Sequence, residues 1–308
     1  MILCADATKI PLPDLSADLV LGSPPYCDAR TYGIGAQRDC QAWIDWMLDV
    51  TTEALRLSKG AVIWVAAGVT RDRNYWPACE GLMYEWWKRG GSMYRPVYWH
   101  RVGIPGSGGD QWFRADVEYC MCFKRPGKLP FTDNTAMGHP PKWAPGGEMA
   151  HRLRNGSRVN QWGPVSNARR GRRANGEQKR GSSPSHVVTT IGKKHTKAKA
   201  NGEMEEQIYL PPAIANPGNL IRTTVGGGQM GDRMAHENEA PYPEDLAEFF
   251  IRSLCPPDGL VLDPFSGSGT TAKTAIAFGR KFIASDIRES QCELTRRRIA
   301  SVQKSLLT

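Results

Sequence analysis

The segment GLVLDPFSGSGTTAKTAIAFGRKFIASDI, residues 259–287, constrains the fold more strongly than any other part of the chain. An apolar run ends at Asp263, a glycine-rich turn follows, helical spacing begins at Thr270, and a second apolar run ends at Asp286. Strands that alternate with helices in this way build parallel sheets. The sequence therefore predicts an α/β fold.

The same alternation is found towards both ends of the chain but not in its middle. We expect strands at residues 2–4, 19–22, 61–67, 93–100, 117–123, 260–262 and 281–285. We expect helices at residues 43–57, 244–254, 270–278 and 289–301. Residues 126 to about 235 hold Pro- and Gly-rich turns with little periodicity, which predicts a separately organised region.

The glycine-rich turn predicts a ligand site. Gly267 and Gly269 let the backbone pass close to a ligand, and the N-terminus of the following helix favours a negatively charged group. Asp286 closes the next strand 17 residues beyond Gly269, where an acid can accept both hydroxyls of a ribose. The turn lacks G-K-[ST], which excludes a phosphate P-loop.

Three interpretations of this turn remain. A dinucleotide site requires G-x-G-x-x-G, and Ala272 at the sixth position is an allowed replacement for glycine. S-adenosylmethionine fits better, because a carboxylate at Asp263 suits the ammonium of a methionine moiety and would repel a pyrophosphate. A purely structural glycine turn is the third alternative.

A second unusual segment is LGSPPYCDARTYG, residues 21–33. The short apolar run before it predicts a strand, which cannot continue through Pro24 and Pro25. The chain is therefore expected to leave the sheet at Ser23 in a stiff, extended turn with Tyr26 at its tip. Each proline removes a backbone donor while the carbonyls stay able to accept hydrogen bonds. A plain turn without function is the alternative.

SPPY together with DPFSGSGTT resembles the amino-group DNA methyltransferases, which methylate cytosine N4 or adenine N6. The order of the two motifs resembles the permuted, beta-class group of that family. The resemblance implies a Rossmann-like sheet of the S-adenosylmethionine-dependent methyltransferases with an inserted basic target-recognition region. It implies a catalytic half at residues 1–125, the target-recognition region at residues 126–235 and a cofactor-binding half at residues 236–308.

The resemblance also assigns site residues. Asp6 follows the first strand and would contact the adenine, and Tyr242 in HENEAPYP would stand for an aromatic at the methionine end. Asp286 stands where the family commonly has the longer Glu. The full cofactor-binding set is Asp6, Tyr242, Asp263, Pro264, Phe265, Gly267, Ser268, Gly269, Thr270 and Asp286. The catalytic set is Ser23, Pro24, Pro25 and Tyr26.

The SPPY turn suits methylation of an exocyclic amine, whose lone pair is delocalised into the base. The Ser23 hydroxyl and the Pro24 carbonyl are rigid acceptors that can hold the amine hydrogens and free the lone pair. Tyr26 offers a face on which a flipped base can stack. Within the family that the chain resembles, serine at the position of Ser23 favours cytosine N4 as the methylated atom. Adenine N6, an RNA substrate and a non-catalytic DNA-binding protein are the alternatives.

Positive charge is concentrated in one segment. Residues 151–200 hold 13 lysines and arginines against one acid, Glu177, a net of +12, whereas the whole chain carries +9 and the remainder therefore −3. Such one-sided charge is typical of polyanion binding, and a solvated linker or a nuclear-localisation signal are the alternatives. The predicted DNA contacts are Arg30, Arg152, Arg154, Arg158, Arg169, Arg170, Arg172, Arg173, Lys193 and Lys194. Arg30 could equally cover a loop.

Composition sets the remaining expectations. No apolar run approaches the roughly 18 residues of a membrane helix, and MILCADATKI lacks the features of a signal peptide. Eight cysteines show no C-x-x-C spacing, so reduced thiols are favoured over zinc even at Cys120 and Cys122. We expect no metal, a cytoplasmic location in a bacterium or as a phage product, and double-stranded DNA as partner. A homodimer and a cognate restriction endonuclease are further partners to consider.

Overall fold

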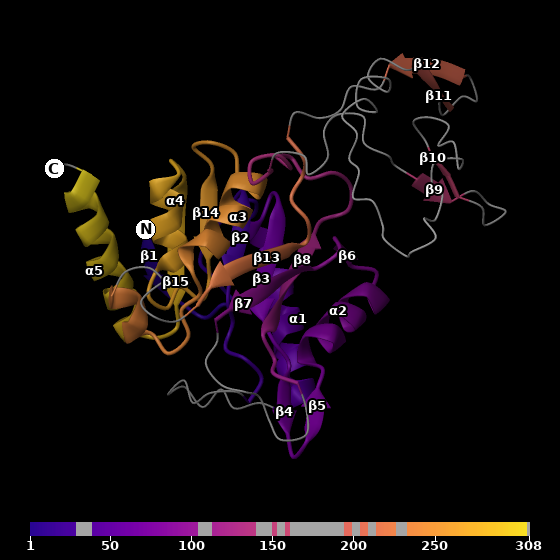
Figure 1. The fold of residues 1–308 in the computed structure, drawn as a ribbon. Coiled ribbons are helices and arrows are strands. Elements are labelled where there is room, and N and C mark those ends of the chain that lie inside the picture. Colours follow the sequence, from indigo (N-terminus) through magenta and orange to yellow (C-terminus); the bar gives the residue numbers. More distant parts are fainter. Residues whose placement is uncertain are drawn as a thin grey trace, which may run out of the picture. The chain divides into compact units, whose positions relative to one another are not determined.

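The computed structural model describes residues 1–28, 39–103, 113–139, 150–152, 158–160, 194–198, 204–208, 214–225 and 233–306 (Figure 1). The chain divides into two compact units. One comprises Met1–Met137 with Pro217–Thr308, and the other Gly138–Asn216. In the described part of the chain, no helix is long and apolar enough to cross a lipid bilayer.

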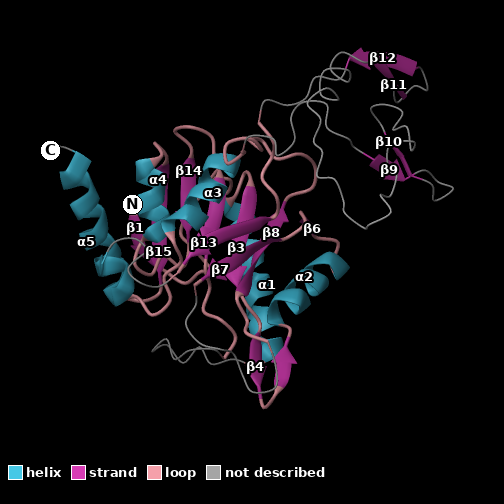
Figure 2. Cartoon of the chain, viewed as in Figure 1, coloured by secondary structure: helices cyan, strands magenta, loops and turns pink. Residues whose placement is uncertain are grey.

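The first unit is built on a nine-stranded sheet in the order β1-β15-β14-β2-β3-β8-β7-β13, with β6 paired to β8. Figure 2 distinguishes these strands, in magenta, from the helices, in cyan. The strands are β1 (Ile2–Cys4), β2 (Leu19–Gly22), β3 (Ala61–Ala66), β6 (Ser92–Met93), β7 (Val97–Val102), β8 (Val117–Lys124), β13 (Leu220–Thr224), β14 (Leu260–Asp263) and β15 (Lys281–Asp286). The α/β fold predicted from the sequence is thus confirmed.

Strand direction decides where the site residues lie. β1, β15, β14, β2 and β3 are mutually parallel, so their carboxyl ends share one edge of the sheet. β8 runs antiparallel to β3, and β7 antiparallel to β8. The amino end of β8 and the carboxyl end of β7 therefore lie at that same edge.

Among the described residues, five α-helices accompany the sheet: α1 (Cys40–Leu57), α2 (Ala78–Lys88), α3 (Glu244–Leu254), α4 (Thr270–Ala277) and α5 (Glu289–Leu306). Alternation along the strands sends side chains to two cores. Val20, Val62 and Trp64 pack with α1 and α2, whereas Leu21 and Ile63 pack with α3 and α4. The sheet is thus apolar on both faces, as its fully buried central strands require.

Several elements differ from the sequence expectation. The strand expected at residues 93–100 is divided into β6 and β7, because Pro96 cannot donate to a ladder between them. Helix α2 was not expected, nor was the hairpin of β4 (Val69–Arg71) and β5 (Asn74–Trp76). β13 pairs with β7 in the main sheet, although the sequence placed residues 220–224 in the target-recognition region.

The second unit contains two short antiparallel pairs among its described residues. β9 (Ala150–Arg152) pairs with β10 (Arg158–Asn160), and β11 (Lys194–Ala198) pairs with β12 (Met204–Ile208). These strands lie in or next to the segment that carries the excess positive charge.

Candidate active site

The predicted site residues gather at the carboxyl edge of the parallel strands. Asp263 ends β14, Asp286 ends β15, Ser23 follows β2, and Asp6 follows β1 by two residues. The register places Asp286 opposite Cys4 and Asp263 opposite Ala284 on adjacent strands. Ligands of open α/β sheets bind at this edge. The topology therefore brings residues that are more than 200 positions apart in the sequence to one site.

Asp263 is the buried carboxylate of this site, 2% exposed. Its Oδ1 accepts a hydrogen bond from the Phe265 backbone N–H at 2.9 Å, and its Oδ2 accepts from the Thr271 hydroxyl at 2.5 Å. The Tyr242 hydroxyl lies 3.5 Å from Oδ2 and also contacts Thr271. Burial raises the pKa of Asp263 to about 7, although the bond from Thr271 opposes the shift. Asp263 therefore orders its own loop as well as offering acceptor oxygens.

The turn that follows needs both of its glycines. Gly267 and Gly269 have φ of +50° and +80°, in the left-handed region that side chains rarely adopt. A Cβ on Gly267 would lie 2.8 Å from Nδ2 of Asn238, and one on Gly269 would lie 2.9 Å from Cγ2 of Thr295. Gly269 is also the N-cap of α4. The turn thus brings backbone close to the carboxyl edge and ends in a helix N-terminus.

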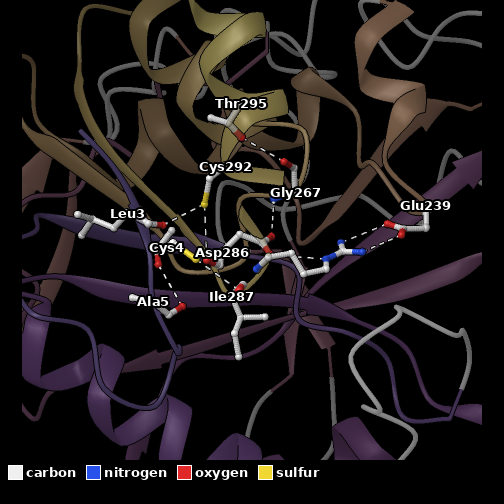
Figure 3. A network of polar contacts seen from close by, with 11 residues as sticks. Leu3, Cys4, Ala5, Glu239, Gly267, Asp286, Ile287, Cys292 and Thr295 are labelled. Carbon is white, nitrogen blue, oxygen red and sulfur yellow. Dashed lines mark hydrogen bonds and ion pairs between the residues drawn. The ribbon is translucent and has the colours of Figure 1, made fainter. Parts of the chain in front are cut away.

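Asp286 joins this turn to β1 (Figure 3). Its Oδ2 accepts from the Gly267 N–H and its Oδ1 from the Arg288 N–H, both at 3.0 Å. The Arg288 side chain also lies 3.7 Å from Oδ1 and pairs with Glu239 at 2.8 Å. Burial raises the pKa of Asp286, while these donors oppose the shift. Each carboxylate oxygen has a second lone pair, which can receive a ligand hydroxyl.

Asp6 is exposed and is held in a turn by the Thr8 N–H and hydroxyl, which donate to its Oδ1 at 2.8 and 2.9 Å. It lines a cavity of about 920 Å³. The other lining residues are Ala5, Lys9, Ile10, Pro11, Leu12, Pro13, Glu53 and Arg56. The fold therefore leaves space beside Asp6 for a ligand group.

The SPPY turn is held on both sides. The Ser23 hydroxyl donates to the Val65 carbonyl at 2.9 Å, so the lone pairs of Oγ stay able to accept. Trp43 Nε1 donates to the Pro25 carbonyl at 2.8 Å. Among the described residues, no hydrogen bond reaches the Pro24 carbonyl. The Tyr26 hydroxyl donates to Glu118.

The ends of β2 and β14, from which the SPPY turn and the glycine turn start, contact one another through Gly22. A Cβ on this residue would lie 2.8 Å from Oδ1 of Asp263 and 3.4 Å from Cδ of Pro264. Phe265, the next residue, packs edge-on against Trp46 and Trp64 with ring centroids 5.8 Å apart in both cases. The two motifs, separated by more than 230 residues in the sequence, thus form one continuous site.

Sequence reasoning missed the residues that support the glycine turn from beneath. Arg298 of α5 is fully buried and donates to the Ser268 carbonyl at 3.1 Å and to the Thr270 hydroxyl at 3.0 Å. Its other nitrogen pairs with Glu244 at 2.9 Å. Nothing in the run of three arginines, 296–298, distinguishes the buried one except helical spacing. Asn238, Thr271 and Thr295 were missed for the same reason, since only tertiary packing brings them to the turn.

The predicted DNA contacts lie largely outside the described residues. Arg30, Arg154, Arg169, Arg170, Arg172, Arg173 and Lys193 are all in undescribed segments. Arg152, Arg158 and Lys194 lie on β9, β10 and β11, whose side chains are not described. The DNA-contact assignments therefore stay predictions.

Cys4, Glu289 and Cys292 bring three possible metal-ligand atoms within 4.8 Å of one another. Each is already engaged. The thiols donate to the carbonyls of Ile287 and Leu3, at 3.5 and 3.2 Å, and Glu289 pairs with Arg296 at 2.7 Å. We assign no metal to this group. Cys120 and Cys122, the pair considered for zinc, are buried in the sheet core.

A similar fold is found in solved structures of DNA methyltransferases. Among solved structures, the PvuII DNA methyltransferase (cytosine-N4-specific) superposes with a TM-score of 0.61 at 16% identity, covering 99% of this chain and 92% of that one. A DNA modification methylase of Thermus thermophilus, TTHA0409, complexed with S-adenosyl-L-methionine, superposes with a TM-score of 0.54 at 20% identity, covering 98% and 93%. At these identities the likeness establishes the fold.

Sequence relatives are similar over shorter stretches. The orphan methyltransferase M.BamHII of Bacillus amyloliquefaciens is 41% identical over 68 residues, 22% of this chain and 26% of that protein. The DNA adenine methyltransferase YhdJ of Escherichia coli K12 is 44% identical over 57 residues, 18% and 19% of the two chains. This chain thus aligns with about a quarter or less of the length of these two relatives. The N6/N4 methyltransferase family, described as DNA methylase, matches residues 17–297, and the chain belongs to that family.

Proposed function

We propose that this chain transfers a methyl group from S-adenosylmethionine to the exocyclic N4 amine of cytosine in duplex DNA. The observation that carries the proposal is the contact between the ends of β2 and β14, from which the SPPY turn and the glycine turn start. Gly22 packs directly on Asp263, so a methyl donor on one turn would face an amine held by the other. Membership of the DNA methylase family supports the reaction class.

The residues at the sheet edge fit the cofactor. Asp286 can accept ribose hydroxyls, Asp263 can accept from the ammonium, and Asp6, which follows β1 at the same edge, would contact the adenine. Gly267 and Gly269 allow the positive φ of the turn and its close packing on Asn238 and Thr295, which brings the backbone to the edge where the cofactor would lie. When bound, S-adenosylmethionine supplies an electrophilic sulfonium methyl group. The Thermus thermophilus neighbour holds this molecule in its own structure, which supports the assignment.

The protein's part in the reaction is to prepare the amine. Ser23 Oγ is oriented by its bond to Val65 and would accept one amine hydrogen, while the Pro24 carbonyl would accept the other. Both acceptors are fixed before the substrate arrives, so little ordering is required in the transition state. Tyr26 would stack on the flipped base and offset part of the cost of extruding it.

The target atom is tested by labelling. Duplex DNA treated with enzyme and methyl-labelled cofactor, digested to nucleosides and analysed by mass spectrometry, is expected to carry label in N4-methylcytosine. Label in N6-methyladenine alone would overturn the cytosine assignment and leave the mechanism intact. Adenine N6 is the second candidate, because YhdJ, a DNA adenine methyltransferase, is among the relatives. Label at cytosine carbon 5 would refute the mechanism, since that carbon needs a nucleophile that the SPPY turn does not offer.

The basic segment is proposed to supply affinity for the DNA backbone. Deletion of residues 165–200 is expected to weaken DNA binding and to reduce the slope of log affinity against log salt, because fewer counterions are released. The deletion removes ten of the 13 basic residues of this segment and its single acid. Fluorescence anisotropy over a salt series measures the slope. An unaltered slope would make the segment a linker.

A further inference from the structure

Glu118 is a buried carboxylate directly behind the proposed catalytic turn. It is 4% exposed, and its Oε2 accepts the hydrogen bond of the Tyr26 hydroxyl. Its Oε1 lies 2.8 Å from Nη1 of Arg101. The carboxylate thus joins a cation on one side to the motif tyrosine on the other.

The topology brings these three residues together from three elements. Glu118 is the second residue of β8, which begins at the edge where β3 ends, since Tyr119 pairs with Ala66. Arg101 lies near the end of β7, which runs antiparallel to β8. Tyr26 reaches the same edge from the turn after β2.

A carboxylate in this place has a cost that an apolar side chain would avoid. Removing a charge from water is unfavourable unless it is paired and hydrogen-bonded, and such pairs rarely add net stability over apolar packing. What a charged Glu118 provides is a strong, directional acceptor, since hydrogen bonds to ionised groups are shorter and stronger than neutral ones. The ion pair with Arg101 holds that acceptor in place.

We propose that Glu118, held by Arg101, is a positioning residue that fixes the ring of Tyr26 for stacking on the extruded base. The proposal rests on the proposed function. Two prolines fix the backbone end of Tyr26, and Glu118 fixes its hydroxyl end. A ring held at both ends presents its face at one place, so the base meets a preformed platform.

The test compares Glu118→Gln, Tyr26→Phe and the double variant. Glutamine keeps the volume of the side chain but loses the charge, and phenylalanine keeps the ring but loses the hydroxyl. The measurements are the single-turnover methyl-transfer rate at saturating DNA, the fluorescence of 2-aminopurine at the target position as a signal of flipping, and the affinity for S-adenosylmethionine.

Glu80→Gln is the matched control. Glu80 also accepts from tyrosine hydroxyls, those of Tyr75 and Tyr119, each at 2.9 Å, whereas the Tyr26 hydroxyl donates to Glu118. We expect E80Q to keep the wild-type rate and flipping signal. If E80Q lost as much of the methyl-transfer rate and of the flipping signal as E118Q, the loss would be a general effect of removing a hydrogen bond between tyrosine and glutamate. That result would overturn the proposal.

Each single variant is expected to lower the methyl-transfer rate and the flipping signal by about tenfold to a hundredfold, the range for a hydrogen bond to a charged group. Affinity for S-adenosylmethionine stays within about twofold of wild type. The double variant should be no slower than the slower single variant, because both changes remove one interaction. A further loss from E118Q in the Y26F background would instead place Glu118 on the base itself and overturn the positioning role.

A readout without catalysis separates this proposal from the proposed function. Protein labelled with 3-fluorotyrosine gives a fluorine resonance for Tyr26, identified by its loss in Y26F. That resonance is expected to shift in E118Q and to stay in place in E80Q, whether or not the wild-type protein methylates DNA. An unshifted resonance overturns the proposal. If E118Q fails to fold, Glu118→Asp keeps the charge while shortening the side chain, and the same shift is expected.

Discussion

Replacement of Asp263 by alanine is expected to abolish measurable binding of S-adenosylmethionine. The change removes the carboxylate proposed to face the ammonium and leaves the Phe265 N–H, the Thr271 hydroxyl and the Tyr242 hydroxyl without their shared acceptor. Loss of a charged acceptor and disorder of the loop together should raise the dissociation constant by at least about a hundredfold. Isothermal titration calorimetry measures it. Unchanged affinity would move the cofactor site elsewhere.

The matched variant is Asp263→Asn, which keeps an acceptor of the same size without the charge. Because burial raises the pKa of Asp263 to about 7, the wild-type carboxyl is largely neutral at pH 5 and ionised at pH 8. Wild-type affinity should therefore rise by up to about tenfold per pH unit between pH 5 and 7 and then level off, while D263N shows no such rise. A rise of equal size in D263N would assign the pH dependence to another group.

The same pKa has a consequence for folding. The unfolded chain releases the Asp263 proton near pH 4, whereas the folded protein keeps it to about pH 7. Between these values the folded state binds more protons, so the contribution of this group to stability falls as pH rises. A bound ammonium would favour the ionised carboxylate and reverse part of that loss.

The segment from α3 to β15 could be predicted because its signals are local. The glycines have positive φ, the apolar runs are continuous, and α3, expected at residues 244–254, has those bounds. Helix α2 was missed because few of its residues are buried and its aromatic residues include the exposed Tyr84 and Trp87. A local sequence pattern predicts a helix or strand well when one face of that element is clearly buried.

The supports of the site could not be predicted because they depend on tertiary packing. Arg298 and Glu118 are charged residues that local rules place on the surface, yet both are buried at the site. Tyr242 was predicted from a family resemblance, and the structure places it against Thr271 and Asp263. Residues that can contact a ligand were therefore easier to identify from the sequence than residues that hold them in place.

Ser23→Ala is expected to slow methyl transfer by about a hundredfold while the affinity for S-adenosylmethionine stays within about twofold, because the variant loses one preorganised acceptor for the amine and nothing at Asp263 or Asp286. Single-turnover kinetics with labelled cofactor measure the rate. Pro24 still offers its carbonyl, so activity falls without disappearing. A wild-type rate in S23A would refute the two-acceptor mechanism.

Ser23→Asn is the variant that distinguishes an acceptor from a merely small residue. The Ser23 hydroxyl donates to the Val65 carbonyl and is proposed to accept from the amine, and an asparagine amide has a donor and an acceptor for the same two partners. S23N should therefore recover much of the rate lost in S23A. A carboxylate at this position would have no donor for Val65, so Ser23→Asp should recover less. If alanine and asparagine were equally slow, the loss would come from altered packing of the turn, and the acceptor role of Ser23 would be withdrawn.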